Sequence, residues 1–343
     1  MRERTPRAVI FGVGGSALSE EERRFFIDAN PLGFILFARN CEDAGQVRAL
    51  VDELKATVGR ADAPVLIDQE GGRVQRLKPP RWRAAPPAAA FGALYSRQEQ
   101  PALEAAFLNA RLLAAELAEL GILVDCAPVL DVLQPDGHEI IGDRAFAAEA
   151  ATVALLGRAT CAGLLQGGVL PVLKHIPGHG RANRDSHHAL PVVDAPLTEL
   201  RAVDFAPFTA LADMPLAMTA HVVYTAVDPD APATTSAIVF EEIIRGMIGF
   251  DGLLISDDLC MRALAGAPGE RAAAALAAGC DVVLHCNGNL EEMREVVAAS
   301  PPLTAAARAR LGRALAMLTP SQTFDRAAAT LRLAALTGTT VNA

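Results

Sequence analysis

Histidines are concentrated in one short segment of the chain. The stretch "KHIPGHGRANRDSHHALP", residues 174–191, holds four of the seven histidines in the 343-residue sequence. It begins at the end of an apolar run, so we expect it to follow a buried strand. Imidazole groups this dense can bind a metal ion or transfer protons, and a merely solvated polar loop is the third interpretation.

The spacing of the histidines does not favour a metal site. The first predicted strand, "AVIFGVGG", carries no metal ligand, and the sequence contains neither His-x-His nor His-Glu-x-x-His. His187 and His188 are adjacent, so their side chains would point apart on an extended backbone. We therefore predict that no metal and no cofactor takes part.

Acid–base chemistry needs a carboxylate and a proton donor, and the sequence offers both. Asp257 ends the apolar run "LLISDD", where it could act as a nucleophile. Asp185 precedes His187 by two residues and could hold one ring nitrogen by a hydrogen bond. An imidazole oriented in this way titrates near neutral pH, which suits a general acid that later acts as a base. Gly178 and Gly180 would let this loop swing.

Short apolar runs alternate with longer amphipathic segments along the whole chain. Because the runs are continuously apolar, we expect a parallel sheet covered on both faces by helices, such as those predicted over 43–58 and 101–121. Eight strand–helix units fit a closed (β/α)8 barrel, and a doubly wound open sheet is the alternative. The predicted strands are 8–13, 33–37, 64–68, 122–131, 168–175, 215–222, 252–258 and 280–286.

Ionisable residues end five of these strands. A buried unpaired charge is costly, so side chains of this kind would gather in a polar pocket rather than in the core. In a (β/α)8 barrel that pocket lies at the carboxyl ends of the strands. The residues are Asp68, Asp131, Lys174 with His175, His221, and Asp257 with Asp258.

The composition excludes several classes of partner. The net charge is −9, and no cluster of basic residues would favour nucleic acid or an anionic membrane. No apolar run approaches the roughly 18–20 residues of a membrane span. The six cysteines include no Cys-x-x-Cys pair and are typical of reduced thiols. In "MRERTPRAVIFGVGG" basic residues precede a short apolar patch, but glycines interrupt the patch, so we interpret it as a first strand rather than a signal peptide and expect a cytoplasmic protein. 

The chain shows no segment that would divide it. We predict one catalytic domain over 1–343, with the barrel over about 8–300 and closing helices over about 302–336. The Pro- and Ala-rich stretch 77–92 is predicted to be a long loop that precedes a helix. We expect the protein to be a monomer.

Six motifs occur together in one order. They are "IDQEGGRVQRL" (67–77), "APVLDV" (127–132), "IGDRAF" (141–146), "KHIPGHG" with "DSH" (174–187), "AHVVYTAVDPDAPATTS" (220–236) and "GFDGLLISDDLCM" (249–261). This series resembles the bacterial β-N-acetylglucosaminidases of glycoside hydrolase family 3, in particular the single-domain cytoplasmic type that recycles cell-wall muropeptides. The resemblance extends from about residue 8 to 290.

The resemblance implies a (β/α)8 barrel and cleavage of terminal β-linked N-acetylglucosamine with retention of configuration. By position, the nucleophile would be Asp257, and the acid/base would be His187 with Asp185 as its partner. Most retaining glycosidases use a second carboxylate in place of this histidine. The sugar-binding residues implied by position are Asp68, Arg76, Arg144, Lys174 and His175.

The chain departs from the family pattern at two positions. Cys260 stands where serine is more familiar, and Ile176 stands where an aromatic residue is usual. The same site could also support phosphorolysis, because a histidine acid/base does not repel an incoming phosphate. A metal-dependent hydrolase and a catalytically inactive sugar-binding protein remain as less favoured alternatives.

Overall fold

The apolar runs of the sequence form the strands of one closed barrel. The computed structural model describes residues 4–135, 137–182, 184–186, 189–318 and 324–338. Around the barrel the strand order is β1-β12-β11-β9-β7-β6-β3-β2, and neighbouring strands are parallel. The predicted (β/α)8 barrel is confirmed, and the open sheet is wrong. The strands are β1 (Arg7–Gly12), β2 (Pro31–Leu36), β3 (Val65–Ile67), β6 (Val124–Asp125), β7 (Leu170–Ile176), β9 (Leu216–Thr219), β11 (Leu253–Asp258) and β12 (Val282–His285).

Each strand is buried on both faces, which explains its continuous apolar sequence. In β1, Ile10 belongs to the cluster inside the barrel, whereas Val9 and Phe11 pack in the cluster between the strands and the helices. This alternation follows from the two-residue period of a strand. Strand β6 is shorter than the predicted run 122–131, and Pro128, which lacks an N–H group for the ladder, lies just beyond its end.

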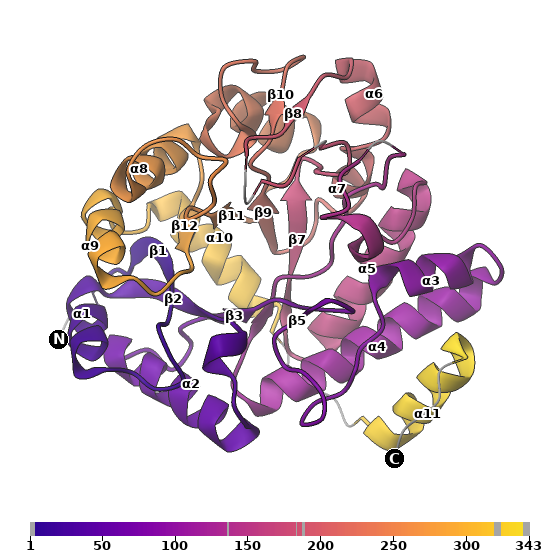
Figure 1. Ribbon diagram of the computed structural model, residues 1–343, viewed down its shortest axis with the longest axis horizontal. Coiled ribbons are helices and arrows are strands. Elements are labelled where there is room, and N and C mark those ends of the chain that lie inside the picture. Colours follow the sequence, from indigo (N-terminus) through magenta and orange to yellow (C-terminus); the bar gives the residue numbers. More distant parts are fainter. Residues whose placement is uncertain (1–3, 136, 183, 187–188, 319–323, 339–343) are drawn as a thin grey trace.

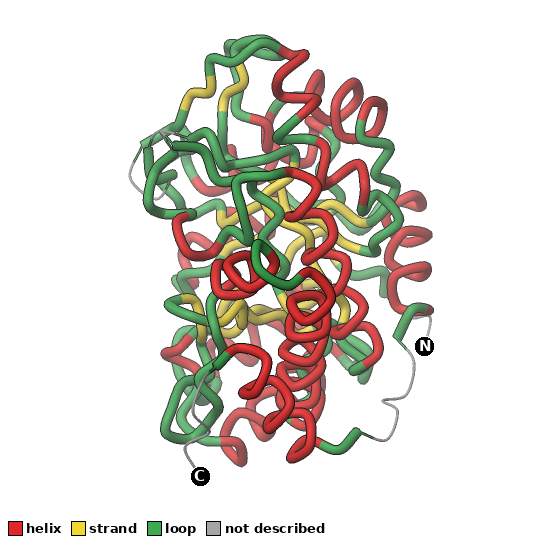
Figure 2. The backbone as a smooth tube through the Cα atoms, turned by 90° about the vertical axis from the view of Figure 1, so that its right-hand side faces the viewer, coloured by secondary structure: helices red, strands yellow, loops and turns green. Residues whose placement is uncertain are grey.

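Helices surround the barrel (Figures 1 and 2). The helices predicted over 43–58 and 101–121 correspond to α2 and α4. The end of the predicted loop 77–92 belongs instead to α3, whose alanine-rich start favours a helix. The helices are α1 (Glu20–Ala29), α2 (Ala44–Val58), α3 (Ala88–Tyr95), α4 (Glu99–Glu119), α5 (Ala150–Gln166), α6 (Leu197–Ala202), α7 (Ala206–Ala210), the π-helical η4 (Val239–Met247), α8 (Pro268–Ala278), α9 (Leu290–Ala299), α10 (Ala305–Ala316) and α11 (Arg326–Thr337).

Short elements stand at the carboxyl ends of the strands, where they form the rim of the barrel. Strands β4 (Gln69–Gly71) and β5 (Val74–Gln75) form a hairpin directly after β3, and β8 (Val192–Val193) pairs with β10 (Val223–Tyr224). Three 3₁₀ helices, η1 (Ala38–Asn40), η2 (Gly142–Arg144) and η3 (Ala233–Thr235), lie in the described loops. These segments carry the polar side chains described below.

The last helix, α11, lies beside α4 (Figure 1). Arg332 donates two hydrogen bonds of 2.7 Å to Glu104 on α4, and Arg326 pairs with Glu119 at the end of the same helix. The predicted division between a barrel over 8–300 and closing helices over 302–336 stays a prediction. Among the described residues, no helix has both the length and the apolarity that crossing a bilayer requires.

Candidate active site

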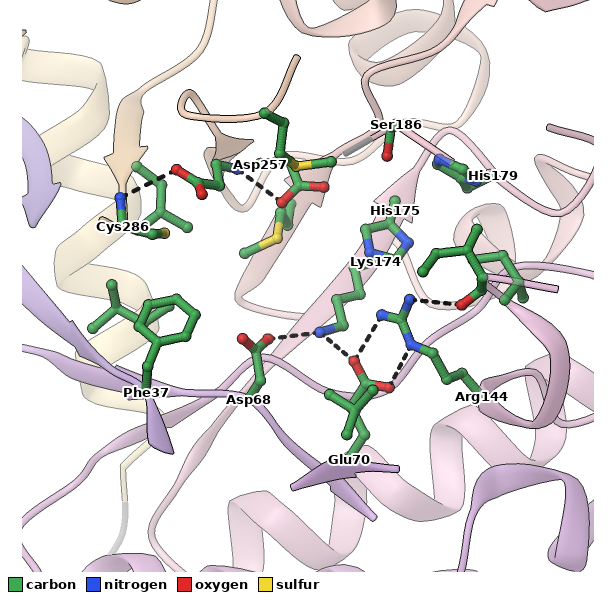
Figure 3. Close-up of a pocket in the computed structure, with 18 of the residues that line it drawn as sticks. Phe37, Asp68, Glu70, Arg144, Lys174, His175, His179, Ser186, Asp257 and Cys286 are labelled. Atoms are coloured by element: carbon green, nitrogen blue, oxygen red, sulfur yellow. Dashed lines mark hydrogen bonds and ion pairs between the residues drawn. The ribbon is translucent and has the colours of Figure 1, made fainter. Parts of the chain in front are cut away.

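A polar pocket of about 250 Å³ opens at the carboxyl ends of the strands. Asp68 follows β3, Lys174 and His175 lie near the end of β7, and Asp257 is the penultimate residue of β11. The barrel thus brings together residues that are far apart in the sequence. Figure 3 shows these side chains around one space. Six of the residues implied by the resemblance line this pocket, namely Asp68, Arg76, Arg144, Lys174, His175 and Asp257.

One side of the pocket is a buried ionic cluster. The Lys174 ammonium group lies 2.9 Å from the Asp68 carboxylate and 2.6 Å from that of Glu70 (Figure 3). Arg144 donates two parallel hydrogen bonds of 2.8 Å to Glu70, and Arg76 donates one of 2.9 Å to Asp68. The Lys174 side chain is 2% exposed, so its long stem is fixed and its charge is shared between two carboxylates.

The cluster keeps both of its carboxylates ionised. Burial alone would raise the pKa of Glu70, but Arg144 and Lys174 reverse this effect and lower the pKa to about 2. Burial would also raise the pKa of Asp68, but Lys174 and Arg76 hold the pKa of this carboxyl well below its usual value. Asp68 therefore presents a carboxylate whose orientation is fixed by two cations.

Asp257 lines the same pocket, and its surroundings favour the ionised form of its carboxyl group. Burial by itself raises the pKa of the Asp257 carboxyl, but the imidazoles of His175 and His221 and the N–H of Asp258 lower it below its ordinary value overall. The Asp258 N–H donates a hydrogen bond of 2.8 Å to Asp257 Oδ1. An ionised, partly neutralised carboxylate at this position can attack an electrophilic carbon.

A fourth carboxylate, Asp131, fixes His175 near the end of β7 and His179 in the loop that follows. Its oxygens accept the N–H groups of His175 and His179, at 3.1 and 2.7 Å, and the ring Nδ1 of His175 lies 2.7 Å away. Burial tends to raise the pKa of Asp131, whereas His175 and His179 lower it to about 2. Burial and the neighbouring His175 lower the pKa of His179 to about 4, so His179 is neutral at pH 7.

His221 is buried and contacts the end of β11. Its Nε2 lies 3.1 Å from the backbone carbonyl of Asp258, and because a carbonyl only accepts, Nε2 carries the proton. Its Nδ1 lies 2.7 Å from the Thr234 hydroxyl. Burial lowers the pKa of His221, and its hydrogen bond to the Asp258 carbonyl supports the end of β11.

The predicted acid/base, His187, lies outside the described residues. Its neighbour Ser186 is described, is buried, and lines the pocket (Figure 3). The carbonyl of Ser186 accepts a 3.2 Å hydrogen bond from the N–H of Ala263, in the loop that follows β11. The segment preceding His187 is therefore joined to the loop that follows Asp257. Asp185 is half-buried and is not among the pocket-lining residues.

The glycines of "PGHG" are explained by close packing rather than by a need for motion. At Gly180 a Cβ atom would lie 1.9 Å from the carbonyl oxygen of Val132, and at Gly178, whose φ is +141°, a Cβ atom would lie 3.0 Å from the carbonyl oxygen of Asp204. Only glycine fits such contacts. The expectation that these two residues serve as a swinging hinge has no support in this geometry.

Sequence reasoning missed Glu70, which bridges Lys174 and Arg144. A signal was present, because Glu70 follows Asp68 by two residues and side chains two apart in an extended segment point to the same side. It also missed the structural role of Asp131, which it recognised only as the end of a strand. No sequence pattern indicates that Asp131 receives three hydrogen bonds from a loop more than 40 residues later.

Comparison with known proteins places this barrel in a family. Residues 8–313 match the model of the glycosyl hydrolase family 3 N terminal domain. The chain belongs to glycosyl hydrolase family 3. A β-hexosaminidase of Bordetella avium (strain 197N) is 40% identical over 305 residues, which are 87% of this chain and 86% of that protein.

Two solved structures share the fold of this family 3 hydrolase. NagZ from Neisseria gonorrhoeae, in complex with N-trifluoroacetyl-D-glucosamine, has a TM-score of 0.88 and 34% identity, over 98% of this chain and all of that one. A family 3 β-N-acetylglucosaminidase from Paenibacillus sp. str. FPU-7 has a TM-score of 0.84 and 31% identity, over 96% of this chain and 66% of that one. The protein is thus a glycoside hydrolase of the β-N-acetylhexosaminidase type, and its substrate is a carbohydrate.

Proposed function

We propose that this β-hexosaminidase is a retaining, exo-acting β-N-acetylglucosaminidase of the cytoplasm. Its substrates would be muropeptides, the N-acetylglucosaminyl-anhydromuramyl fragments of peptidoglycan, and its role the recycling of the cell wall. The observation that carries the proposal is an ionised Asp257 in the same pocket as the cluster of Asp68, Lys174 and Arg76. The N-trifluoroacetyl-D-glucosamine bound to the Neisseria protein supports an N-acetylated sugar.

The ionic cluster suits the binding of sugar hydroxyls. Each oxygen of Asp68 already accepts one hydrogen bond, from Lys174 or from Arg76. A carboxylate has about four acceptor positions, so two remain for a pair of adjacent hydroxyl groups. Lys174 and Arg144 can in turn donate to sugar oxygens, because neither an ammonium nor a guanidinium group is saturated by the contacts described.

In the first step of the proposed mechanism, Asp257 attacks the anomeric carbon of the terminal sugar. A bond forms between that carbon and a carboxylate oxygen of Asp257 while the bond to the leaving-group oxygen breaks. His187 gives its proton to that oxygen, so that the leaving sugar departs as an alcohol. This role of His187 rests on the family resemblance and on the position of Ser186 in the pocket.

In the second step, water replaces the leaving group. The neutral His187 takes a proton from the water as the water oxygen attacks the anomeric carbon, and the bond to Asp257 breaks. Two inversions at the same carbon give net retention. Asp257 is released as a carboxylate, and His187 regains the proton that it needs for the next cycle.

The product of the reaction tests this proposal. We expect turnover of a chromogenic β-N-acetylglucosaminide to exceed that of the matching β-glucoside, and proton NMR during the first minutes to show the β-anomer of free N-acetylglucosamine. Initial formation of the α-anomer would contradict retention. Accumulation of N-acetylglucosamine 1-phosphate in phosphate buffer would favour phosphorolysis in place of hydrolysis. A purified anhydromuropeptide cleaved no faster than a chitin disaccharide would contradict the substrate assignment.

A further inference from the structure

Three potential metal ligands meet outside the sugar pocket. Cys260 lies in the loop after β11, His285 is the last residue of β12, and Glu292 lies in the first turn of α9. The Cys260 thiol, one ring nitrogen of His285 and one carboxylate oxygen of Glu292 all lie within 4.8 Å of one another. None of the three lines the sugar pocket, so the proposed hydrolysis does not account for them.

The two ligands on β12 and α9 already have a spacing that suits a metal ion. His285 Nε2 lies 3.1 Å from Glu292 Oε2. Zinc bonds of about 2.0–2.1 Å at a tetrahedral angle place such atoms about 3.3 Å apart. The Cys260 sulfur would need to approach to about 3.5 Å, given a zinc–sulfur bond of about 2.3 Å. Cys260 is half-buried in a loop, where a change of rotamer can supply this movement.

The surroundings of His285 fix the position of its ring. The residue is fully buried, and its Nδ1 has no hydrogen-bond partner among the described residues. The edge of the ring packs against Phe11, which restricts its orientation. Glu292 is partly exposed, so a cation can enter from solvent and retain one water molecule. Asn287 Nδ2 also donates to Glu292 Oε2, at 2.8 Å, and orients that carboxylate.

We propose that Cys260, His285 and Glu292 form a binding site for a thiophilic divalent cation of the zinc class. A thiolate, an imidazole and a carboxylate together select such ions over Mg²⁺ and Ca²⁺, which prefer oxygen ligands alone. On binding, the Cys260 thiol releases its proton to solvent, because only the thiolate is a ligand. The site is structural and takes no part in glycoside cleavage.

The site would stabilise the segment next to the nucleophile. Asp258 Oδ1 accepts hydrogen bonds from the N–H groups of Cys260 and Cys286, at 3.0 and 3.1 Å. These two residues lie on the two chain segments that a bound cation would join. A cation held by Cys260 and His285 therefore restrains the loop that follows Asp257 against the end of β12.

Cobalt(II) binding to the full-length, metal-free protein tests the proposal, because thiolate ligation gives a sulfur-to-cobalt charge-transfer band. We expect the band in the wild type, its loss in Cys260→Ser, and a dissociation constant for Co²⁺ at least about 10-fold weaker in Glu292→Gln. Cys41→Ser removes a partly buried thiol outside the site and should keep the band, as should Asp257→Asn. Zinc should displace the cobalt and raise the unfolding midpoint of the wild type and of Cys41→Ser, but not that of Cys260→Ser.

Three results would overturn the site: no charge-transfer band in the wild type, a band that persists in Cys260→Ser, or an equal loss in Cys41→Ser. The far-ultraviolet circular dichroism of each variant establishes that it is folded before the metal is added. Because the cobalt band does not depend on turnover, its absence would leave the proposed glycosidase mechanism untouched. Loss of activity in Asp257→Asn with an unchanged band would likewise separate the two claims.

Discussion

Replacement of Glu70 by glutamine tests whether the ionic cluster organises the sugar site. Glu70 is the shared partner of Lys174 and Arg144, and its side chain is 7% exposed. Glutamine keeps the shape of the side chain but removes the negative charge between two buried cations. Removing one partner of a buried pair costs about 3–5 kcal/mol of stability. Because Lys174 keeps its ion pair with Asp68, at 2.9 Å, we expect a loss near the lower end of this range, about 3 kcal/mol in the free energy of unfolding.

The same change should weaken catalysis through substrate binding. If Lys174 and Arg144 lose their fixed positions, a charged hydrogen bond to the sugar weakens by about 1.5–3 kcal/mol. This corresponds to about a 10- to 150-fold loss in kcat/KM, which should appear mainly as a higher KM, since the contact exists before the transition state. Kinetics with a chromogenic β-N-acetylglucosaminide and urea unfolding measure the two effects.

Glu104→Gln provides a matched control. Arg332 binds Glu104 through the same two parallel hydrogen bonds, at 2.7 Å, but that pair lies on the surface between α4 and α11. An exposed pair of this kind is worth about 0–1 kcal/mol, and neither residue lines the pocket. We expect Glu104→Gln to retain full activity. If Glu70→Gln behaved like this control in both stability and kcat/KM, the organising role of Glu70 would be refuted.

Two further predictions concern the proton donor and the Asp131 carboxylate. His187→Ala should lose little with a nitrophenolate leaving group and about 10²- to 10⁴-fold with a sugar alcohol, and an equal loss with both substrates would contradict the acid role. Asp131→Asn should lower the free energy of unfolding by roughly 2–3 kcal/mol near pH 6, because the pKa of Asp131 is about 2 in the folded protein and about 3.9 when unfolded. This stabilising contribution of the Asp131 carboxylate is complete above about pH 5 and declines as the pH falls from about 4 to about 2. The free energies of unfolding of the wild type and of Asp131→Asn, measured with urea, should therefore converge in that range. A difference between them that does not change with pH would contradict the low pKa of Asp131.

The barrel was predictable because its determinants are local. Each apolar run of the sequence is long enough to mark a strand, and the charged residues Asp68, Lys174 and Asp257 mark where three strands end. The strand boundaries were less predictable. The run 122–131 looked like one strand, but the regular strand β6 ends at Asp125, and Val129 then forms an isolated bridge with Lys174. Hydrophobicity indicates burial rather than strand pairing. Because both halves of that run are buried, the sequence does not show where the strand ends.

The ionic partnerships could not be predicted in the same way. Glu70 and Arg144 are 74 residues apart, and only the closure of the barrel brings the β4–β5 hairpin to η2. Asp131 likewise receives its hydrogen bonds from residues 44 and 48 positions later. Such pairs depend on the exact placement of loops on the rim, which no periodicity in the sequence encodes. The motifs indicated which residues belong to the site, but not which of them hold the others in place.

Covalent labelling tests most directly whether Asp257 is the nucleophile of a retaining mechanism. A slow fluorosugar analogue of N-acetylglucosamine should accumulate as a covalent glycosyl-enzyme, and mass spectrometry of peptides should locate the added mass at Asp257 within "SDDLCM". Asp257→Asn should show no label. A label at Asp258 or Asp68, or full inactivation with no covalent adduct, would contradict the account.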